Sequence, residues 1–131
     1  MDANTRCPCN PDARYADCCG RWHDGPRRGM APDAEQLMRS RYSAFVLGLA
    51  DYLLETWHPA HRPPRIEPDP PGLSWLGLQV KRHASADATH ATVEFVARSK
   101  LGGRAHRHHE LSRFEKLDGR WLYVDGSHPQ G

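Results

Sequence analysis

Four cysteines, the only ones in the chain, fall within a stretch of thirteen residues: Cys7, Cys9, Cys18 and Cys19. A disulfide between Cys7 and Cys9, or between Cys18 and Cys19, would close a very small and strained ring. Thiolate sulfur is a preferred ligand of Zn²⁺, which takes four ligands in a tetrahedron at about 2.3 Å. Two closely spaced pairs supply these ligands with little loss of chain entropy. We therefore predict a zinc site, with a redox or disulfide role as the alternative.

A zinc ion with four sulfur ligands has no open position for a substrate. We therefore expect this site to fold the first thirty residues and not to catalyse a reaction. His23 is close enough in sequence to serve as a nitrogen ligand in place of one cysteine. A packing or capping role for His23, beside Trp22, is the other interpretation.

The cysteine spacing resembles the SEC-C zinc motif, and this resemblance implies that basic and aromatic side chains are presented around the metal. Such a surface would suit an acidic partner, such as a protein or a ribosome. Acidic residues in the same segment, and the two net negative charges of a zinc ion with four thiolates, oppose this hypothesis. A solvated loop is the alternative. The candidate docking residues are Arg6, Arg14, Arg21, Trp22, Arg27 and Arg28.

The elements that position these residues follow from the residue pattern. Residues 1–31 are polar and interrupted by Pro and Gly, so they cannot bury much apolar surface. A helix is predicted to begin near Pro32 and to end at Gly48. A shorter helix should cover residues 51–57, and the six prolines within 59–71 predict an extended connection.

Beyond the proline-rich connection the pattern changes to alternating apolar and polar residues, which is typical of strands. Helices followed by hairpins predict an α+β fold, in which the helices cover one face of a curved antiparallel sheet. The expected strands cover residues 75–83, 91–100, 105–117 and 120–125.

Arg41 falls near the centre of the apolar stripe of the first predicted helix. A buried guanidinium needs a counter-charge or access to water inside a cavity. We predict an ion pair with Glu110 or Asp125, and the alternative is that Arg41 grips a ligand in a pocket between the helices and the sheet. A histidine beside a carboxylate in that pocket could transfer protons. The other candidate pocket residues are Tyr42, Trp57, His83, His108 and Tyr123.

Length and charge limit the classes of function. The chain has 131 residues and a formal charge of +2, which is too balanced to indicate nucleic-acid or membrane binding. Residues 98–113 hold five basic residues and one acidic residue, so this segment could bind nucleic acid locally, although a solvated strand edge is the simpler interpretation. The chain has no apolar run of about 20 residues that could span a bilayer. We expect a cytoplasmic protein.

The spacing of the cysteines, Cys7-Pro8-Cys9 followed by Cys18-Cys19, resembles the SEC-C zinc motif. Residues 19–25, 34–45 and 119–126 resemble the YchJ-like, or UPF0225, bacterial proteins. The resemblance implies a SEC-C motif in residues 1–31 and a domain in residues 32–131 with the cone shape of cystatin-like and nuclear-transport-factor-two-like folds. It implies no settled activity.

These observations favour a zinc-binding protein that docks onto another macromolecule through its N-terminal segment and basic surface. A ligand-binding or enzymatic pocket centred on Arg41 is the alternative. No nucleophile and base, phosphate-binding glycine loop or open metal site occurs at a motif spacing, so the sequence leaves catalysis undecided.

Overall fold

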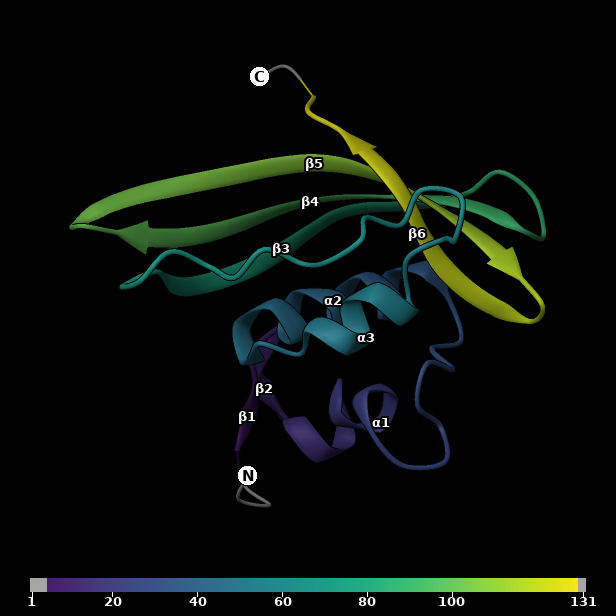
Figure 1. The fold of residues 1–131 in the computed structure, drawn as a ribbon, viewed down its shortest axis with the longest axis horizontal. Coiled ribbons are helices and arrows are strands. Elements are labelled where there is room, and N and C mark those ends of the chain that lie inside the picture. The colour runs from purple at the N-terminus through teal and green to yellow at the C-terminus, as the bar shows by residue number, and fades with distance from the viewer. Residues whose placement is uncertain (1–4, 130–131) are drawn as a thin grey trace.

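The computed structural model describes residues 5–129. Its elements form three layers: a four-stranded sheet, the helices α2 (Ala34–Leu47) and α3 (Ala50–Glu55) on one face of that sheet, and the N-terminal segment on the far side of the helices (Figure 1). The predicted α+β class is confirmed, as is the arrangement of helices on one face of an antiparallel sheet.

The N-terminal segment consists of short elements: β1 (Arg6–Cys7), β2 (Asn10–Arg14), the 3₁₀ turn η1 (Tyr15–Asp17) and the single helical turn α1 (Gly20–His23). Strands β1 and β2 pair in antiparallel fashion with Cys7 opposite Asn10, so Cys9 lies in the tight connection between them. Gly20 has no room for a side chain, because a Cβ there would lie 2.7 Å from the carbonyl oxygen of Tyr15. This close turn brings the second pair of cysteines back towards the first.

Helix α2 is capped at both ends by its own sequence. The side chain of Asp33 accepts a hydrogen bond from the backbone N–H of Gln36 at 2.8 Å, so the helix begins at Ala34, shortly after the predicted start. Gly48 ends the helix as predicted, in a left-handed conformation with φ of 73°. Helix α3 covers a slightly shorter range than predicted and is followed by the proline-rich connection, which contains no helix or strand.

The sheet is an antiparallel meander in which each strand pairs with the next one in the chain. Each strand lies within two residues of its predicted bounds: β3 (Ser74–Ser85), β4 (His90–Leu101), β5 (Arg104–Leu117) and β6 (Arg120–Ser127). The sequence pattern does not show on which face of the sheet each side chain of β5 lies. In the structure Glu110 pairs with Phe95 and Ser112 pairs with Val93, so these four side chains share one face of the sheet.

Helix α2 is buried on two faces, whereas the sequence predicts one apolar stripe. Leu37 and Ala44 are fully buried, as the stripe implies. Ser40 and Ser43 are equally buried because the N-terminal segment packs over them. The helix therefore separates the cysteine cluster on one side from the sheet on the other.

Candidate functional site

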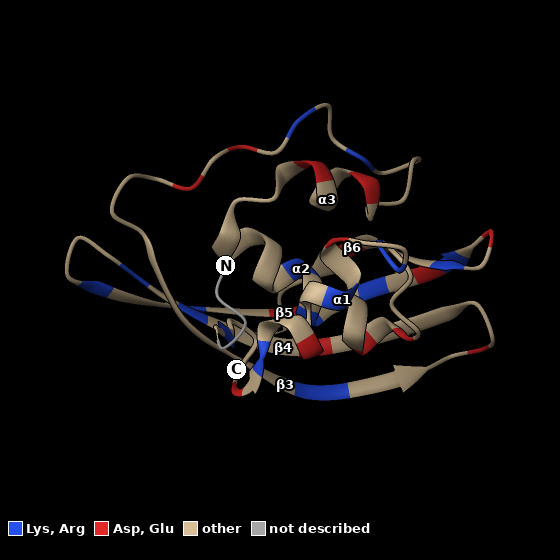
Figure 2. Cartoon of the chain, turned by 90° about the horizontal axis from the view of Figure 1, so that it is seen from below, with Lys and Arg blue, Asp and Glu red and all other residues tan. Residues whose placement is uncertain are grey.

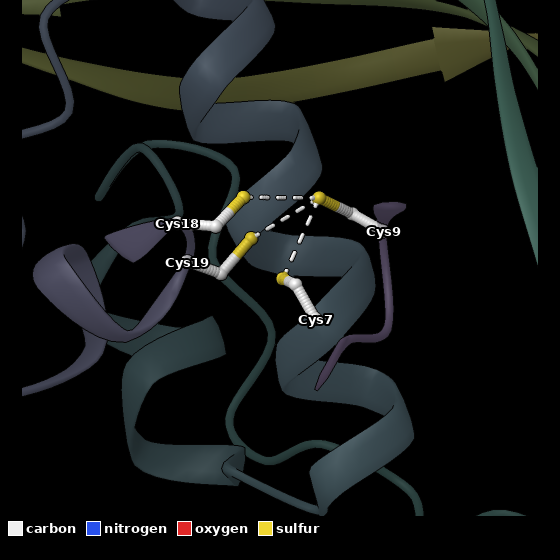
Figure 3. Close-up of side chains that lie close together, drawn as sticks. All are labelled: Cys7, Cys9, Cys18 and Cys19. Atoms are coloured by element: carbon white, nitrogen blue, oxygen red, sulfur yellow. Dashed lines mark hydrogen bonds between the residues drawn. The ribbon is translucent and has the colours of Figure 1, made fainter. Parts of the chain in front are cut away.

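The four cysteine side chains converge on one point beside α2 (Figure 3). Their sulfur atoms all lie within 4.8 Å of one another, and Sγ of Cys9 lies 3.6 Å from Cys7, 3.6 Å from Cys18 and 3.5 Å from Cys19. A tetrahedral ion with metal–sulfur bonds of about 2.3 Å places its sulfur ligands about 3.8 Å apart. All four thiols are free. The cluster has the size and the donor set of a metal site.

The protonation of the cluster also favours a cation. Hydrogen bonding with Cys19 and Cys9 lowers the pKa of the Cys7 thiol, whereas hydrogen bonding with Cys7 and Cys9 raises the pKa of the Cys19 thiol. Negative charges this close oppose one another, so all four thiols lose their protons together only when a cation is present. Ser43 of α2 donates a hydrogen bond to Sγ of Cys19 at 3.2 Å. Such an outer contact orients a ligand atom and joins the cluster to the helix.

His23 lies outside the cluster. Its Nδ1 is 2.5 Å from the hydroxyl of Tyr15, and its Nε2 is 2.6 Å from the carbonyl oxygen of Ser40. Since the carbonyl can only accept, Nε2 carries the proton and Nδ1 accepts from the tyrosine. Burial lowers the pKa of His23, which keeps this neutral form. The structure thus gives His23 the packing role and uses both of its nitrogens in that role.

Several predicted docking residues are engaged within the protein. Arg14 donates to Asp17 at 2.8 Å, and Arg28 forms an ion pair with Glu55. Trp22 is only 6% exposed and belongs to the core, so its prediction as part of a docking surface is wrong. The apolar ring supplies core packing for a segment that has few other large side chains. The docking candidates that stay exposed without an ion pair in the described part of the chain are Arg6, Arg21 and Arg27.

Basic residues gather at the tip of the β4–β5 hairpin (Figure 2). Arg98, Lys100, Arg104 and Arg107 are exposed there, and none forms an ion pair within residues 5–129. Nucleic-acid binding by this hairpin stays a prediction. Within the same residues, no helix combines the length and the apolar character needed to cross a membrane.

Arg41 projects from α2 to the end of α3. Its Nη1 donates one hydrogen bond to the carbonyl oxygen of Leu53 at 2.7 Å and another to Oγ1 of Thr56 at 2.7 Å. The guanidinium carbon lies 4.7 Å from the ring centre of Tyr123 and 5.1 Å from that of Trp57, which are cation–π distances. The charge is thus held by neutral oxygens and aromatic rings.

The predicted ion pair of Arg41 with Glu110 or Asp125 is wrong. No carboxylate of the described residues lies within 4.0 Å of the guanidinium, and Asp125 instead accepts a hydrogen bond from Arg113 at 2.6 Å on the other face of the sheet. The residue pattern did not reveal that the end of α3 supplies oxygen atoms to Arg41. Arg41 is 6% exposed, and burial lowers the pKa of its guanidinium to about 10.

A cavity of about 330 Å³ lies between α2 and the sheet, and Arg41 forms part of its wall. The structure brings together six of the residues predicted for the pocket: Arg41, Tyr42, Trp57, His108, Glu110 and Tyr123. Most of the remaining wall is apolar or aromatic. It is formed by Met38, Phe45, Trp75, Phe95, Ala97 and Phe114.

Glu110 is the acceptor of a hydrogen-bond network in this cavity. It accepts from Nε2 of His108 at 3.0 Å, from the hydroxyl of Tyr123 at 3.1 Å and from the hydroxyl of Ser112. Burial acts to raise the pKa of Glu110, but the hydrogen bonds from His108 and Ser112 outweigh it, and the pKa is lowered. The Glu110 carboxylate raises the pKa of His108 in turn. A Cβ at Gly126 would overlap the carboxylate of Glu110, so the network in its present geometry requires a glycine there.

The cavity wall lacks two of the predicted residues, His83 and Asp125, and includes an unpredicted one, Asp69. His83 does not line it and lies 4.0 Å from Glu35 instead. Asp69, from the proline-rich connection, lies in the wall and accepts a hydrogen bond from Nε1 of Trp75 at 2.9 Å. Neither Asp69 nor Trp75 was predicted from the sequence to line the cavity.

Known proteins resemble both the cysteine-containing N-terminal segment and the domain formed by the helices and the sheet. The family described as "YchJ, middle NTF2-like domain" matches residues 33–126. A UPF0225 protein of Bordetella pertussis is 62% identical over 120 residues, which cover 92% of this chain and 90% of that protein. The chain belongs to the UPF0225, YchJ-like family. A UPF0225 protein of Methylibium petroleiphilum is 61% identical and covers 92% of this chain, with 86% of its own length matched.

Two solved structures that are similar to this chain carry the SEC-C motif in their descriptions. The solution structure of a SEC-C motif-containing protein from Rhodopseudomonas palustris superposes with a TM-score of 0.81 at 36% identity, covering 96% of this chain and 100% of that chain. The crystal structure of another, from Psychrobacter arcticus, has a TM-score of 0.78 at 33% identity and covers 98% of this chain and 85% of that chain. The resemblance read from the sequence is confirmed, including the NTF2-like domain.

Proposed function

We propose that this UPF0225 protein is a cytoplasmic, zinc-stabilised ligand-binding protein. Zn²⁺ held by Cys7, Cys9, Cys18 and Cys19 fixes the N-terminal segment. The cavity of the NTF2-like domain binds a small anionic molecule through Arg41.

The donor set supports zinc in the cluster. Four thiolates at tetrahedral spacing suit Zn²⁺, and they leave no open position for a substrate. The N-terminal segment has only a few large buried side chains of its own, among them Trp22, so the metal supplies folding free energy that this segment otherwise lacks. The test is elemental analysis of protein purified without oxygen. One zinc per chain is expected in the wild type and none in Cys9→Ser, and a wild type free of metal would refute the proposal.

One observation carries the ligand-binding proposal: a nearly fully buried guanidinium, with no carboxylate partner within residues 5–129, lines an open cavity. A buried charge is costly unless it is compensated. The contacts that Arg41 makes to neutral oxygens and rings compensate it in part. An anionic ligand in the cavity would complete the compensation. The geometry therefore supports the pocket hypothesis over a structural ion pair.

A fluorescence titration with an anionic aromatic probe, anilinonaphthalene sulfonate, tests ligand binding. Saturable binding at one site is expected in the wild type. Binding should weaken in Arg41→Gln and stay unchanged in Arg82→Gln, which removes an exposed arginine of β3. Equal binding by wild type and Arg41→Gln would refute a role for Arg41 in ligand binding.

Docking onto an acidic protein or a ribosome is the second candidate. The exposed arginines Arg6, Arg21 and Arg27, which have no ion pair among the described residues, favour it. Charge reversal at Arg21 and Arg27 should abolish salt-sensitive association with ribosomes if docking occurs through this surface. Association that survives both reversals would exclude that surface.

A further inference from the structure

We propose that the ligand of the cavity is a small aromatic monocarboxylate. Its carboxylate is held by Arg41, and its ring lies among the aromatic side chains between α2 and the sheet. This inference rests on the proposed ligand-binding function and specifies the chemical class of the ligand.

The free donors of Arg41 define the shape of the anionic group. Both hydrogen bonds of the guanidinium within the described residues come from Nη1. Nε and Nη2 have no hydrogen-bond partner there. Both atoms keep some solvent-accessible surface, although the residue as a whole is only 6% exposed. These two nitrogens form one edge of the planar guanidinium. That edge matches the two oxygen atoms of a carboxylate, which it can bind with two parallel hydrogen bonds.

The charges in the wall of the cavity favour an anion with a single charge. Glu110 is compensated by three donors, one of them His108, and it makes no ion pair with Arg41. Asp69 adds another carboxylate to the wall. Arg41 is thus the positive charge of the wall that lacks a partner. A dianion such as a phosphate monoester would place a second negative charge near Glu110 and Asp69 in a site of low dielectric constant.

The rest of the wall favours an aromatic body. The ring of Trp75 meets that of Tyr42 edge to face, with ring centres 5.7 Å apart, and lies 6.4 Å from the ring of Phe45. Phe95 and Phe114 close the cavity on the sheet side. Aromatic rings pack well against such surfaces in offset or edge-to-face geometry. A volume of about 330 Å³ accommodates one substituted ring and is too small for a large cofactor.

A set of matched probes tests this inference by isothermal titration calorimetry: benzoate, its neutral isostere benzamide, phenyl phosphate and cyclohexane carboxylate. Benzoate is expected to bind about tenfold more tightly than benzamide, since a hydrogen-bonded charge pair is lost. It should also bind more tightly than phenyl phosphate and cyclohexane carboxylate. Arg41→Gln should remove the preference for benzoate over benzamide, Arg41→Lys should keep part of it, and Arg82→Gln should keep all of it. Thermal unfolding of each variant shows whether it is folded.

The outcomes separate this inference from the proposed function. If benzamide or phenyl phosphate binds as tightly as benzoate, or if cyclohexane carboxylate does, the assignment of an aromatic monocarboxylate is wrong. In that case saturable binding of anilinonaphthalene sulfonate would still support a ligand-binding cavity. If none of these probes binds the folded wild type, both proposals fail. If Arg41→Gln does not fold, a reduced benzoate preference in folded Arg41→Lys still supports the bidentate contact, and an unchanged preference overturns it.

Discussion

The pair formed by His108 and Glu110 predicts a pH-dependent contribution to stability. Nε2 of His108 lies 3.0 Å from Oε1 of Glu110, and the side chains are 48% and 14% exposed. The pKa of His108 is raised above its ordinary value of 6.5, so the stabilisation from its charged form is present below pH 6.5 and is lost as the pH rises through the folded-state pKa. The pKa of Glu110 is lowered below 4.5, so its contribution is present above pH 4.5 and is lost as the pH falls through the folded-state pKa.

The pair therefore stabilises the protein most between pH 4.5 and 6.5. Because His108 is half-exposed, solvent screening limits the contribution to about 0.5–1 kcal/mol. The variant Glu110→Gln keeps an acceptor of the same shape and removes the charge. It should lose this stability in urea unfolding within that pH range and should lose much less well above pH 6.5, where His108 is neutral.

A two-dimensional NMR titration of the histidine rings checks the cause directly. The pKa of His108 should fall in Glu110→Gln. The control is Glu94→Gln, which removes the carboxylate that lies 2.7 Å from Nε2 of His109 on the opposite face of the sheet. This control should leave His108 unchanged. An unaltered His108 pKa in Glu110→Gln would refute the claim that the carboxylate holds the proton on that ring.

Three further predictions concern the backbone and the metal. Gly20→Ala should destabilise the protein by about 1–3 kcal/mol in thermal unfolding, because the new Cβ would lie 2.7 Å from the carbonyl oxygen of Tyr15; an unchanged melting temperature would contradict this close contact. Removal of zinc by a chelator should shift the tryptophan emission of the protein to the red, because Trp22 becomes exposed, while the β-sheet signal in circular dichroism persists; loss of the β-sheet signal as well would show that the domain depends on the metal for its fold. Gly126→Ala should displace the carboxylate of Glu110 and weaken benzoate binding in calorimetry, with wild-type affinity as the contrary result.

The sequence predicted the strands well and the environment of the helix less well. Strand bounds follow from alternation and turn residues, which are local signals, and the cysteine spacing is local too. The partner of Arg41 depends on how α2 and α3 pack, and that packing is set by contacts between distant residues. Trp22 was predicted on a docking surface because the resemblance to the SEC-C motif implies exposed aromatic residues around the metal, yet this short segment buries its few large rings. The second buried face of α2 could not be predicted from Ser40 and Ser43, because serine side chains are not hydrophobic.

The two faces of α2 connect the metal site with the cavity. Gln36, Ser40 and Ser43 are spaced at helical intervals on the face towards the N-terminal segment, where they contact Arg21, His23 and Cys19.

The opposite face carries Met38, Arg41, Tyr42 and Phe45 into the cavity. Figure 1 shows the same order of layers, with α2 between the N-terminal segment and the sheet. A helix held on only one side can shift or rotate, and a bidentate contact tolerates little misplacement of its guanidinium. The N-terminal segment therefore supports α2 from the side away from the cavity and holds Arg41 in position against the sheet, while the cysteine cluster lies on the opposite face of the helix from the cavity.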